Sequence, residues 1–341
     1  MNSMTPDALR RALQDVRTGR LADATTLIQN TLAQHGLADA GFSGGAGKMP
    51  PYPGLKTPGQ GPMPGRARFT NEAGSRDYLV HLPKGRETAP RGLVLMLHGC
   101  TQTPEDFAIG TAMNAQADAA GLVVIYAAQA RGDNAQSCWN WFSGADQQHG
   151  RGEPAILAGL VREVAEKHAV PDQAIFVAGL SAGAAMAVIL GRTYPDVFAG
   201  VGAHSGLPYG CARGVSEAFA AMAGQGAGKR GKPAKRSVAT IVFHGASDAT
   251  VTQTNGQQIF NDARAPAGAQ TEIIDDGKTA GRSFRRITSL GTGGKVLAEH
   301  WQIDGLGHAW SGGNPAGSYA DAQGPDASAE MIRFFAALGQ T

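Results

Sequence analysis

The residues most able to do chemistry in this chain form a Gly-x-Ser-x-Gly sequence around Ser181. An apolar run, Ala-Ile-Phe-Val-Ala, precedes this sequence, and a second, Ala-Ala-Met-Ala-Val-Ile-Leu, follows it. Such flanks are typical of a buried strand that turns sharply into a buried helix. Gly179 and Gly183 fit this turn, since side chains there would collide with neighbouring elements. The pattern therefore predicts a nucleophile elbow, with the Ser181 hydroxyl exposed as the nucleophile.

The same five-residue pattern occurs a second time, around Ser43 between Gly41 and Gly45. This copy lies in a stretch dominated by glycine and proline, with no strand-like run before it and no helical pattern after it. Because the elbow needs both flanking elements, we favour Ser181 over Ser43.

A serine hydroxyl is a weak nucleophile until a base takes its proton, so a histidine is expected downstream. In proteins with this elbow the chain order is serine, then acid, then histidine. His308 lies in Asp-Gly-Leu-Gly-His-Ala-Trp, after the last expected strand and before the final helix. Of the alternatives, His300 falls inside an expected strand, His244 ends one, and His204 precedes any suitable acid. We therefore predict His308 as the general base.

The acid that orients this histidine should follow a strand between the serine and the histidine. Asp248 comes a few residues after the apolar run Val-Ala-Thr-Ile-Val-Phe and is our predicted acid. Asp275 and Asp276 follow a less apolar segment and are the fallback, while Asp304 lies too near His308 for the usual loop.

Two backbone N–H groups are predicted to hold the oxyanion of the tetrahedral intermediate. One is the N–H of Ala182, which follows the nucleophile, and the other is that of Cys100 in Leu-His-Gly-Cys after an early apolar strand. Gly99 would allow the backbone to approach the reacting carbonyl closely. The alternative, that the Cys100 thiol is itself a nucleophile, has little support while Ser181 is present.

The elements that must position these residues alternate along the chain from about residue 66. Strand-like runs cover 66–71, 78–82, 93–97, 122–127, 174–178, 201–203, 238–243 and 296–303, and helical patterns cover 108–120, 154–168, 182–194, 252–263 and 325–338. This alternation predicts an α/β fold, with a mostly parallel central sheet that carries helices on both faces. The two opening strands should form an antiparallel hairpin at one edge.

Residues 1–36 carry two helix-period apolar stripes with Gly19 between them, and we expect a helical hairpin appendage there. Such a hairpin is expected to pack on its own domain or on a second subunit, and packing on a second subunit would give a homo-oligomer. Residues 37–65 are rich in glycine and proline and are expected to be a linker. The catalytic domain would then span 66–341.

Composition excludes several other classes of function. The formal net charge is +2, from 30 basic and 28 acidic side chains, so no electrostatic case exists for nucleic acid or an anionic membrane. No apolar run of signal-peptide length or of about 18 residues occurs, and a cytoplasmic protein is expected unless a leader was trimmed. Three cysteines are too few for a zinc site, and no cofactor or metal is expected.

Six segments carry a family resemblance. They are Leu-His-Gly-Cys-Thr-Gln, Ser-Cys-Trp-Asn-Trp-Phe, Gly-Leu-Ser-Ala-Gly-Ala, Ala-His-Ser-Gly-Leu-Pro-Tyr-Gly-Cys, His-Gly-Ala-Ser-Asp and Gly-His-Ala-Trp. The resemblance covers roughly residues 68–310. The chain resembles the polyhydroxybutyrate (PHB) depolymerase family of esterases, near relatives of feruloyl and acetylxylan esterases. The resemblance implies an α/β-hydrolase fold, the triad Ser181, Asp248 and His308, and an oxyanion donor at Cys100.

The resemblance also implies a substrate class. Hydroxyalkanoate oligomers or related small esters are the first choice, since secreted depolymerases carry a signal peptide and often a polymer-adsorbing domain that we do not find in this sequence. A feruloyl- or acetylxylan-type esterase is the alternative. A non-catalytic scaffold would be expected to have lost a triad residue, and none is lost.

Family members place tryptophans near the site, against the acyl or alcohol part of the ester. The candidates for such a substrate wall are Trp310, Trp139, Trp141 and Tyr209, although an aromatic side chain is as often part of the core. The family also places Cys138 and Cys211 near each other. A disulfide between them stays open, because the family pattern favours it and a reducing cytoplasm opposes it.

The two serine motifs make opposite predictions. Ser181→Ala should lower kcat on a soluble ester by about 10⁴-fold or more, leaving only the help of the oxyanion hole and binding. The matched control, Ser43→Ala, should leave kcat unchanged in the same assay. Loss of turnover in Ser43→Ala would show that the strand and helix context had been misread.

Overall fold

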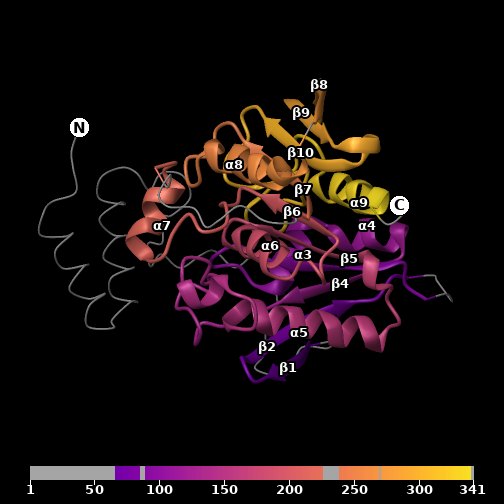
Figure 1. The fold of residues 1–341 in the computed structure, drawn as a ribbon, viewed down its shortest axis with the longest axis vertical. Helices are drawn as coiled ribbons and strands as arrows, with labels where there is room; N and C mark the ends of the chain where they lie inside the picture. Colours follow the sequence, from indigo (N-terminus) through magenta and orange to yellow (C-terminus); the bar gives the residue numbers. More distant parts are fainter. Residues whose placement is uncertain (1–65, 85–88, 226–237, 269, 339–341) are drawn as a thin grey trace, which may run out of the picture. The chain divides into compact units, whose positions relative to one another are not determined.

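The computed structural model describes residues 66–84, 89–225, 238–268 and 270–338, shown in colour in Figure 1. The chain divides into two units, Met1–Pro62 and Met63–Thr341, and the fold described below belongs to the second. The hairpin expected at 1–36 and the linker expected at 37–65 lie outside the described residues.

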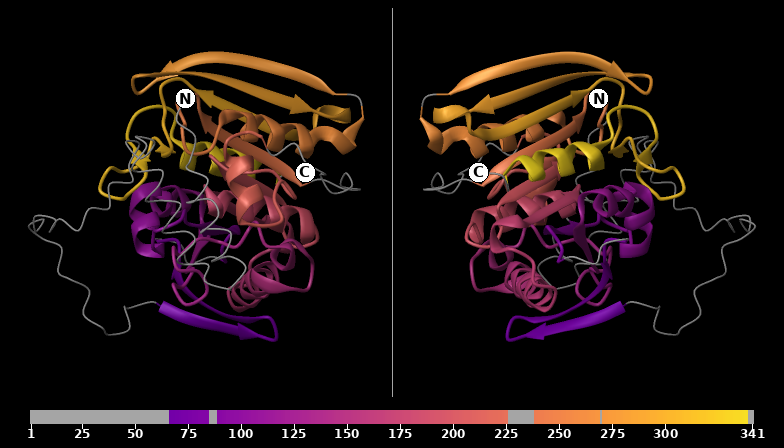
Figure 2. Two further views of the ribbon diagram at one scale, coloured as in Figure 1. Left: turned by 90° about the vertical axis from the view of Figure 1, so that its left-hand side faces the viewer. Right: turned by 90° about the vertical axis from the view of Figure 1, so that its right-hand side faces the viewer.

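A ten-stranded sheet forms the centre of the described part of the chain, with the strand order β1-β2-β4-β3-β5-β6-β7-β10-β9-β8. The strands are β1 Arg66–Asn71, β2 Gly74–His81, β3 Gly92–Leu97, β4 Leu122–Ala127, β5 Ile175–Leu180, β6 Gly200–His204, β7 Ala239–Gly245, β8 Thr271–Thr279, β9 Arg282–Leu290 and β10 Val296–Ile303. From β4 to β10 neighbouring strands are parallel, whereas β1 and β2 at one edge and β9 and β8 at the other are antiparallel. Figure 2 shows these two antiparallel edges at opposite ends of the unit. The mostly parallel sheet predicted from the sequence is confirmed.

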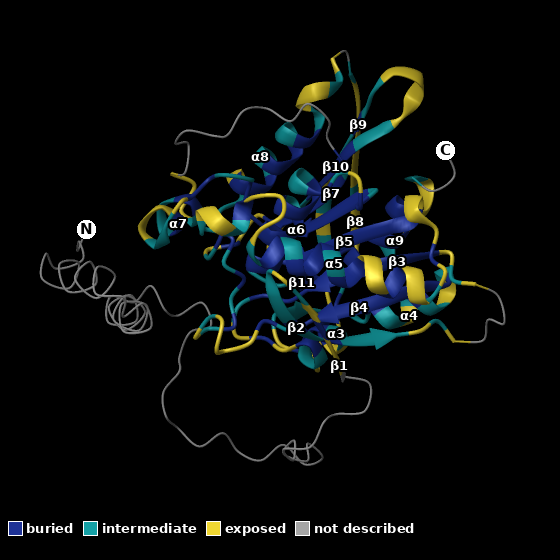
Figure 3. Ribbon diagram, turned by 60° about the horizontal axis from the view of Figure 1, so that its bottom comes forward, coloured by how far each residue is buried: buried dark blue, intermediate teal, exposed yellow. Residues whose placement is uncertain are grey.

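Helices cover both faces of this sheet. They are α3 Pro104–Thr111, α4 Met113–Ala120, α5 Gly152–Lys167, α6 Ala182–Thr193, α7 Val215–Met222, α8 Gln253–Arg264 and α9 Ala327–Leu338. Side chains of a strand alternate between its two faces. Along β3, Leu93, Leu95 and Leu97 pack in one core cluster with α5 and α6, while Val94 and Met96 pack in another with α4 and α9. The central strands are buried on both sides for this reason, as the dark blue strands of Figure 3 show.

Several elements differ from the sequence prediction. The single helix expected at 108–120 is two helices, α3 and α4, because Ala112 between them has a left-handed φ of 51°. The β8–β9 hairpin was not predicted, since β8 is exposed along almost its whole length and carries no apolar alternation. Helix α7 and the short parallel pair β11 (Trp310–Ser311) and β12 (Ala320–Asp321) were also missed. Within the described residues no helix is long and apolar enough to cross a membrane.

Four histidines are completely buried in this core: His98, His204, His244 and His300. Burial disfavours their charged forms and lowers the pKa of His98 to about 4 and those of His204 and His300 to about 3. The pKa of His244 is lowered for the same reason. The native protein therefore keeps four neutral imidazoles at pH values where an unfolded chain would protonate them.

This burial predicts acid sensitivity. Below about pH 6.5 these histidines become protonated in the unfolded chain but stay neutral in the native state. Each histidine therefore lowers the free energy of unfolding by up to about 1.4 kcal/mol for each pH unit of acidification. Glu153 acts oppositely, because burial raises its pKa to about 7. The single effect of Glu153 is smaller than that of the four buried histidines, so the free energy of unfolding should fall between pH 6 and pH 4. Urea titrations at several pH values would measure this change.

His300 offers the sharpest variant, because neither ring nitrogen has a hydrogen-bond partner among the described residues. His300→Leu should flatten the pH slope by about one proton without costing a hydrogen bond. The matched control is exposed His149. His149→Gln should leave the dependence of the unfolding free energy on pH unchanged. If His300→Leu also left it unchanged, buried neutral His300 would not be a source of the acid sensitivity.

Candidate active site

Ser181 lies at the sharp turn between the carboxyl end of β5 and the start of α6. Its φ of 57° and ψ of −119° are unusual for a residue with a side chain, and this strain is typical of a nucleophile elbow. A Cβ at Gly179 would collide with the backbone of Gly183, and one at Gly183 would collide with the backbone of Leu97. The two glycines thus allow α6 to begin directly against the end of β3.

Asp248 and His308 are brought together from two different loops after β7 and β10. His308 Nδ1 lies 2.8 Å from Asp248 Oδ2. The other carboxylate oxygen accepts the N–H groups of Thr250 and Val251, at 3.0 and 2.9 Å. Burial by itself would raise the pKa of Asp248, but the hydrogen bonds and the nearby His308 outweigh it and hold this pKa below its usual value. An ionised Asp248 keeps the proton on Nδ1 and leaves Nε2 of His308 as the basic nitrogen.

Two of the histidines weighed as alternatives lie close to the candidate site, since His244 Nε2 is 3.6 Å from Asp248 Oδ2 and the His204 carbonyl accepts the Ser181 N–H. His204, His244 and His300 are completely buried, and His204 Nε2 already accepts the N–H of Ser311. Asp275 and Asp276 lie on exposed β8 and pair with arginines of β9. Neither set can therefore meet a substrate at Ser181.

In the loop after β3, the His98 carbonyl and both the N–H and the carbonyl of Gly99 are hydrogen-bonded. The His98 carbonyl accepts Trp139 Nε1–H at 3.0 Å, and the Gly99 N–H donates to Gln102 Oε1 at 2.9 Å. The Gly99 carbonyl lies 2.8 Å from His98 Nδ1. The N–H of Cys100 takes part in none of the hydrogen bonds found among the described residues.

This loop abuts the nucleophile, because a Cβ at Gly99 would lie 3.7 Å from the Cβ of Ser181. The N–H of Ala182 belongs to the first residue of α6 and so lacks an acceptor within the helix. Two donors without backbone partners thus flank Ser181, as an oxyanion hole requires.

Cys100 is linked by a disulfide to Cys138. The pair left open from the sequence, Cys138 with Cys211, is therefore not formed, and Cys211 lies buried in the core. A count of three cysteines could not reveal which two are neighbours in the fold. The bond links the loop after β3, residues 98–103, which is the candidate oxyanion loop, to the segment that carries Trp139.

The aromatic residues proposed as a substrate wall lie mainly in the core. Trp310 and Trp139 are completely buried and Trp141 is 6% exposed, so the prediction of substrate contact is wrong for the first two. Trp310 packs on Phe107 and His204, next to the catalytic loops. Tyr209 is partly buried and donates its hydroxyl to the Gln147 carbonyl. These tryptophans support the site instead of lining it.

Tyr319 lies beside His308 and was not singled out from the sequence. Its ring lies edge-on to His308, with 6.4 Å between ring centroids, and the side chain is only partly buried. Its φ of 50° is left-handed, which is rare for a bulky residue. The Tyr319 carbonyl accepts the Trp310 N–H and so fixes this position. No periodic pattern surrounds Tyr319, so nothing in the sequence pointed to it.

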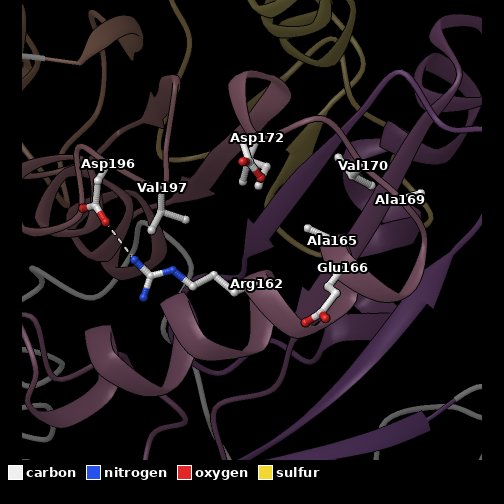
Figure 4. A pocket seen from close by; sticks show the side chains of 9 residues that line it. Arg162, Ala165, Glu166, Ala169, Val170, Asp172, Asp196 and Val197 are labelled. Carbon is white, nitrogen blue, oxygen red and sulfur yellow. Dashed lines mark hydrogen bonds and ion pairs between the residues drawn. The ribbon is translucent and has the colours of Figure 1, made fainter.

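A hollow at the other end of the sheet is not this site. It lies near the amino end of β5, lined by Ile175 and by Arg162, which pairs with Asp196 at 2.7 Å (Figure 4). Ser181 follows the carboxyl end of the same strand, where ligands bind in open α/β sheets. Within the described residues no three His, Cys, Asp or Glu side chains are grouped to hold a metal ion.

The family model for the esterase PHB depolymerase matches residues 76–264. The chain belongs to this family. The matched segment includes Cys100, Ser181 and Asp248 but ends before His308. This finding confirms the resemblance that the six sequence segments carried.

Two depolymerases illustrate the relationship. Poly(3-hydroxyalkanoate) depolymerase C of Paucimonas lemoignei is 31% identical over 258 residues, which cover 71% of this chain and 60% of that protein. Poly(3-hydroxybutyrate) depolymerase of Ralstonia pickettii is 31% identical over 280 residues, covering 73% of this chain and 54% of that protein. This PHB depolymerase-family chain thus spans a little over half the length of both relatives.

A solved structure agrees on the fold. An acetyl xylan esterase from Aspergillus awamori superposes with a TM-score of 0.54 at 21% identity, covering 68% of this chain and 89% of that one. This similarity confirms the predicted α/β-hydrolase fold for the family member.

The two candidate acids can be separated by substitution. Asp248→Asn should lower kcat by roughly 10⁴-fold, because an amide in place of the carboxylate favours the wrong tautomer of His308. Asp276→Asn, the control, should keep kcat near that of the wild type. The reverse result in steady-state assays would move the acid to β8.

The disulfide makes a separate prediction. Cys100→Ala and Cys138→Ala each open the same 38-residue link, and each should lower the unfolding free energy by about 4 kcal/mol. Both keep the Cys100 N–H, so kcat should fall less than the roughly 10²–10³-fold expected for a lost donor. A folded Cys100→Ala enzyme that is far less active than Cys138→Ala would give the Cys100 sulfur a chemical role.

Proposed function

We propose that this protein is a serine esterase that hydrolyses carboxylic esters through an acyl-enzyme on Ser181. The observation that carries the proposal is the His308–Asp248 hydrogen bond, with both residues on loops at the sheet edge where Ser181 forms its strained elbow. Membership of an esterase family supports the same reaction class.

In the acylation step the Ser181 hydroxyl oxygen attacks the ester carbonyl carbon while His308 Nε2 takes its proton. The carbonyl oxygen becomes an oxyanion that accepts the N–H groups of Cys100 and Ala182. As the tetrahedral intermediate collapses, the alcohol leaves with the proton from His308. Water then repeats the sequence on the acyl-serine and releases the acid.

For the substrate we propose hydroxyalkanoate oligomers. Two relatives named as depolymerases of poly(3-hydroxyalkanoate) and poly(3-hydroxybutyrate) support this class. The chain spans only 60% and 54% of these two relatives, so for it we propose hydrolysis of soluble oligomers and not the whole activity of either. A feruloyl- or acetylxylan-type ester is the second candidate, and the ring of Tyr319 beside His308 would suit a flat acyl group.

An oxidising compartment fits this protein better than the cytoplasm expected from the sequence. The Cys100–Cys138 disulfide supports this location, since such bonds rarely persist in reducing compartments. A homo-oligomer through residues 1–36 stays a prediction, because that segment lies outside the described residues.

A panel of soluble esters tests the proposal. Hydroxybutyrate trimers, p-nitrophenyl acyl esters of increasing length and methyl ferulate should be compared by kcat/KM, with Ser181→Ala as the control. Trimers are expected to rank first, and a preference for methyl ferulate would instead support the second candidate. No Ser181-dependent turnover of any ester would reject the function itself.

A further inference from the structure

Behind the oxyanion loop lies a buried polar cluster that the reaction steps above do not use. It consists of Arg76 on β2, Gln129 after β4 and Glu153 at the start of α5, each 5% exposed or less. The Gln129 side chain accepts a hydrogen bond from Arg76 and donates one to Glu153. Burying charged groups in the core costs free energy unless every partner is well placed, so a contribution to stability alone does not explain why this cluster is present.

One residue of the cluster, Gln129, determines through its backbone N–H which ring nitrogen of His98 carries the proton. The backbone N–H of Gln129 lies 3.1 Å from His98 Nε2 and can only donate. Nε2 must therefore accept, and the neutral ring carries its proton on Nδ1. The same Nδ1 lies 2.8 Å from the Gly99 carbonyl, to which it donates.

The Gly99 carbonyl and the Cys100 N–H belong to one planar trans peptide and point in opposite directions. A ring that holds the carbonyl on one side therefore directs the N–H to the other side. We propose that His98 is a positioning residue for ester hydrolysis, which holds the Cys100 N–H toward the oxyanion and is itself held by the backbone N–H of Gln129, whose side chain is hydrogen-bonded to Glu153. This inference rests on the proposed function and on Cys100 as oxyanion donor.

The same cluster supports the loop from a second direction. Glu153 accepts the backbone N–H and the side-chain amide of Asn140, both at 2.8 Å. Gln129 also donates to the Cys138 carbonyl at 2.9 Å. The segment fixed in this way contacts the oxyanion loop twice, through the Cys138 disulfide and through Trp139 Nε1 on the His98 carbonyl.

Two substitutions of His98 separate the donor from the rest of the ring. In His98→Asn the amide nitrogen can occupy the place of Nδ1 and still donate to the Gly99 carbonyl, whereas His98→Leu has no donor. We expect His98→Leu to lower kcat by roughly 10²-fold, close to the loss of one oxyanion donor, and His98→Asn to lower it by less than about 10-fold. KM should stay within about threefold in both, because the N–H acts on the transition state more than on bound ester.

Glu153→Gln tests the support of the ring. It keeps the shape of the side chain but removes an acceptor for Asn140, and kcat should fall by about 10-fold. The control is Glu166→Gln, on the same helix but away from the cluster, which should leave kcat unchanged. Affinity for a trifluoromethyl ketone, whose adduct with Ser181 carries the oxyanion, should fall in parallel with kcat/KM across the series.

The outcomes separate the two proposals. If wild type hydrolyses esters and Ser181→Ala does not, the proposed function stands whatever His98 does. A folded His98→Leu with wild-type kcat, or equal losses in His98→Asn and His98→Leu, would then overturn the positioning role. Nitrogen-15 NMR of wild type adds a test that needs no variant to fold: the His98 ring should be protonated on Nδ1, and a ring protonated on Nε2 would also overturn the role.

Discussion

The active site depends on one close approach of backbone to backbone, where the first turn of α6 meets the end of β3. Gly183 allows it, since any side chain there would strike the carbonyls of Leu97 and His98. The contact places the loop that begins at His98 against Ser181, and a nucleophile and two N–H donors become neighbours. The left-handed φ of Ser181 is the local cost of this geometry, and the buried strands on either side maintain it.

A second requirement follows from the first, because a loop pressed against the nucleophile must also be held in one orientation. Trp139 and His98 donate hydrogen bonds to the carbonyls of His98 and Gly99, Gln102 Oε1 accepts the Gly99 N–H, and the disulfide fixes the next residue. Gln102 also donates to the Ser318 carbonyl, next to Tyr319 and its contact with His308. The oxyanion loop and the histidine loop are therefore held by one connected set of contacts.

The sequence led to Ser181, Asp248 and His308 because each stands in a local pattern, and chain order then assigns the roles. The structure brings Asp248 and His308 into contact, as that reasoning requires. Other features depend on which segments meet in the fold. The pairing of Cys100 with Cys138, the burial of Trp310 and the place of Tyr319 beside His308 all involve segments that meet only in the folded protein. The β8–β9 hairpin was missed for another reason, since an exposed edge leaves no apolar alternation to read.

The misreading of the tryptophans leads to a physical point about the site. An aromatic side chain beside a catalytic motif suggests substrate contact, yet Trp139 and Trp310 are buried. Their indole N–H groups donate hydrogen bonds to the His98 carbonyl and the Ser328 hydroxyl. Stabilising an oxyanion requires donors that do not reorganise during the reaction, and rigid buried rings limit such movement better than solvent-exposed ones. Burial also affects Glu153 in the cluster behind the oxyanion loop, because it raises the pKa of this carboxyl to about 7 and so weakens its negative charge near neutral pH. In the arrangement we propose, this buried cluster supports the residues that orient a single N–H, that of Cys100.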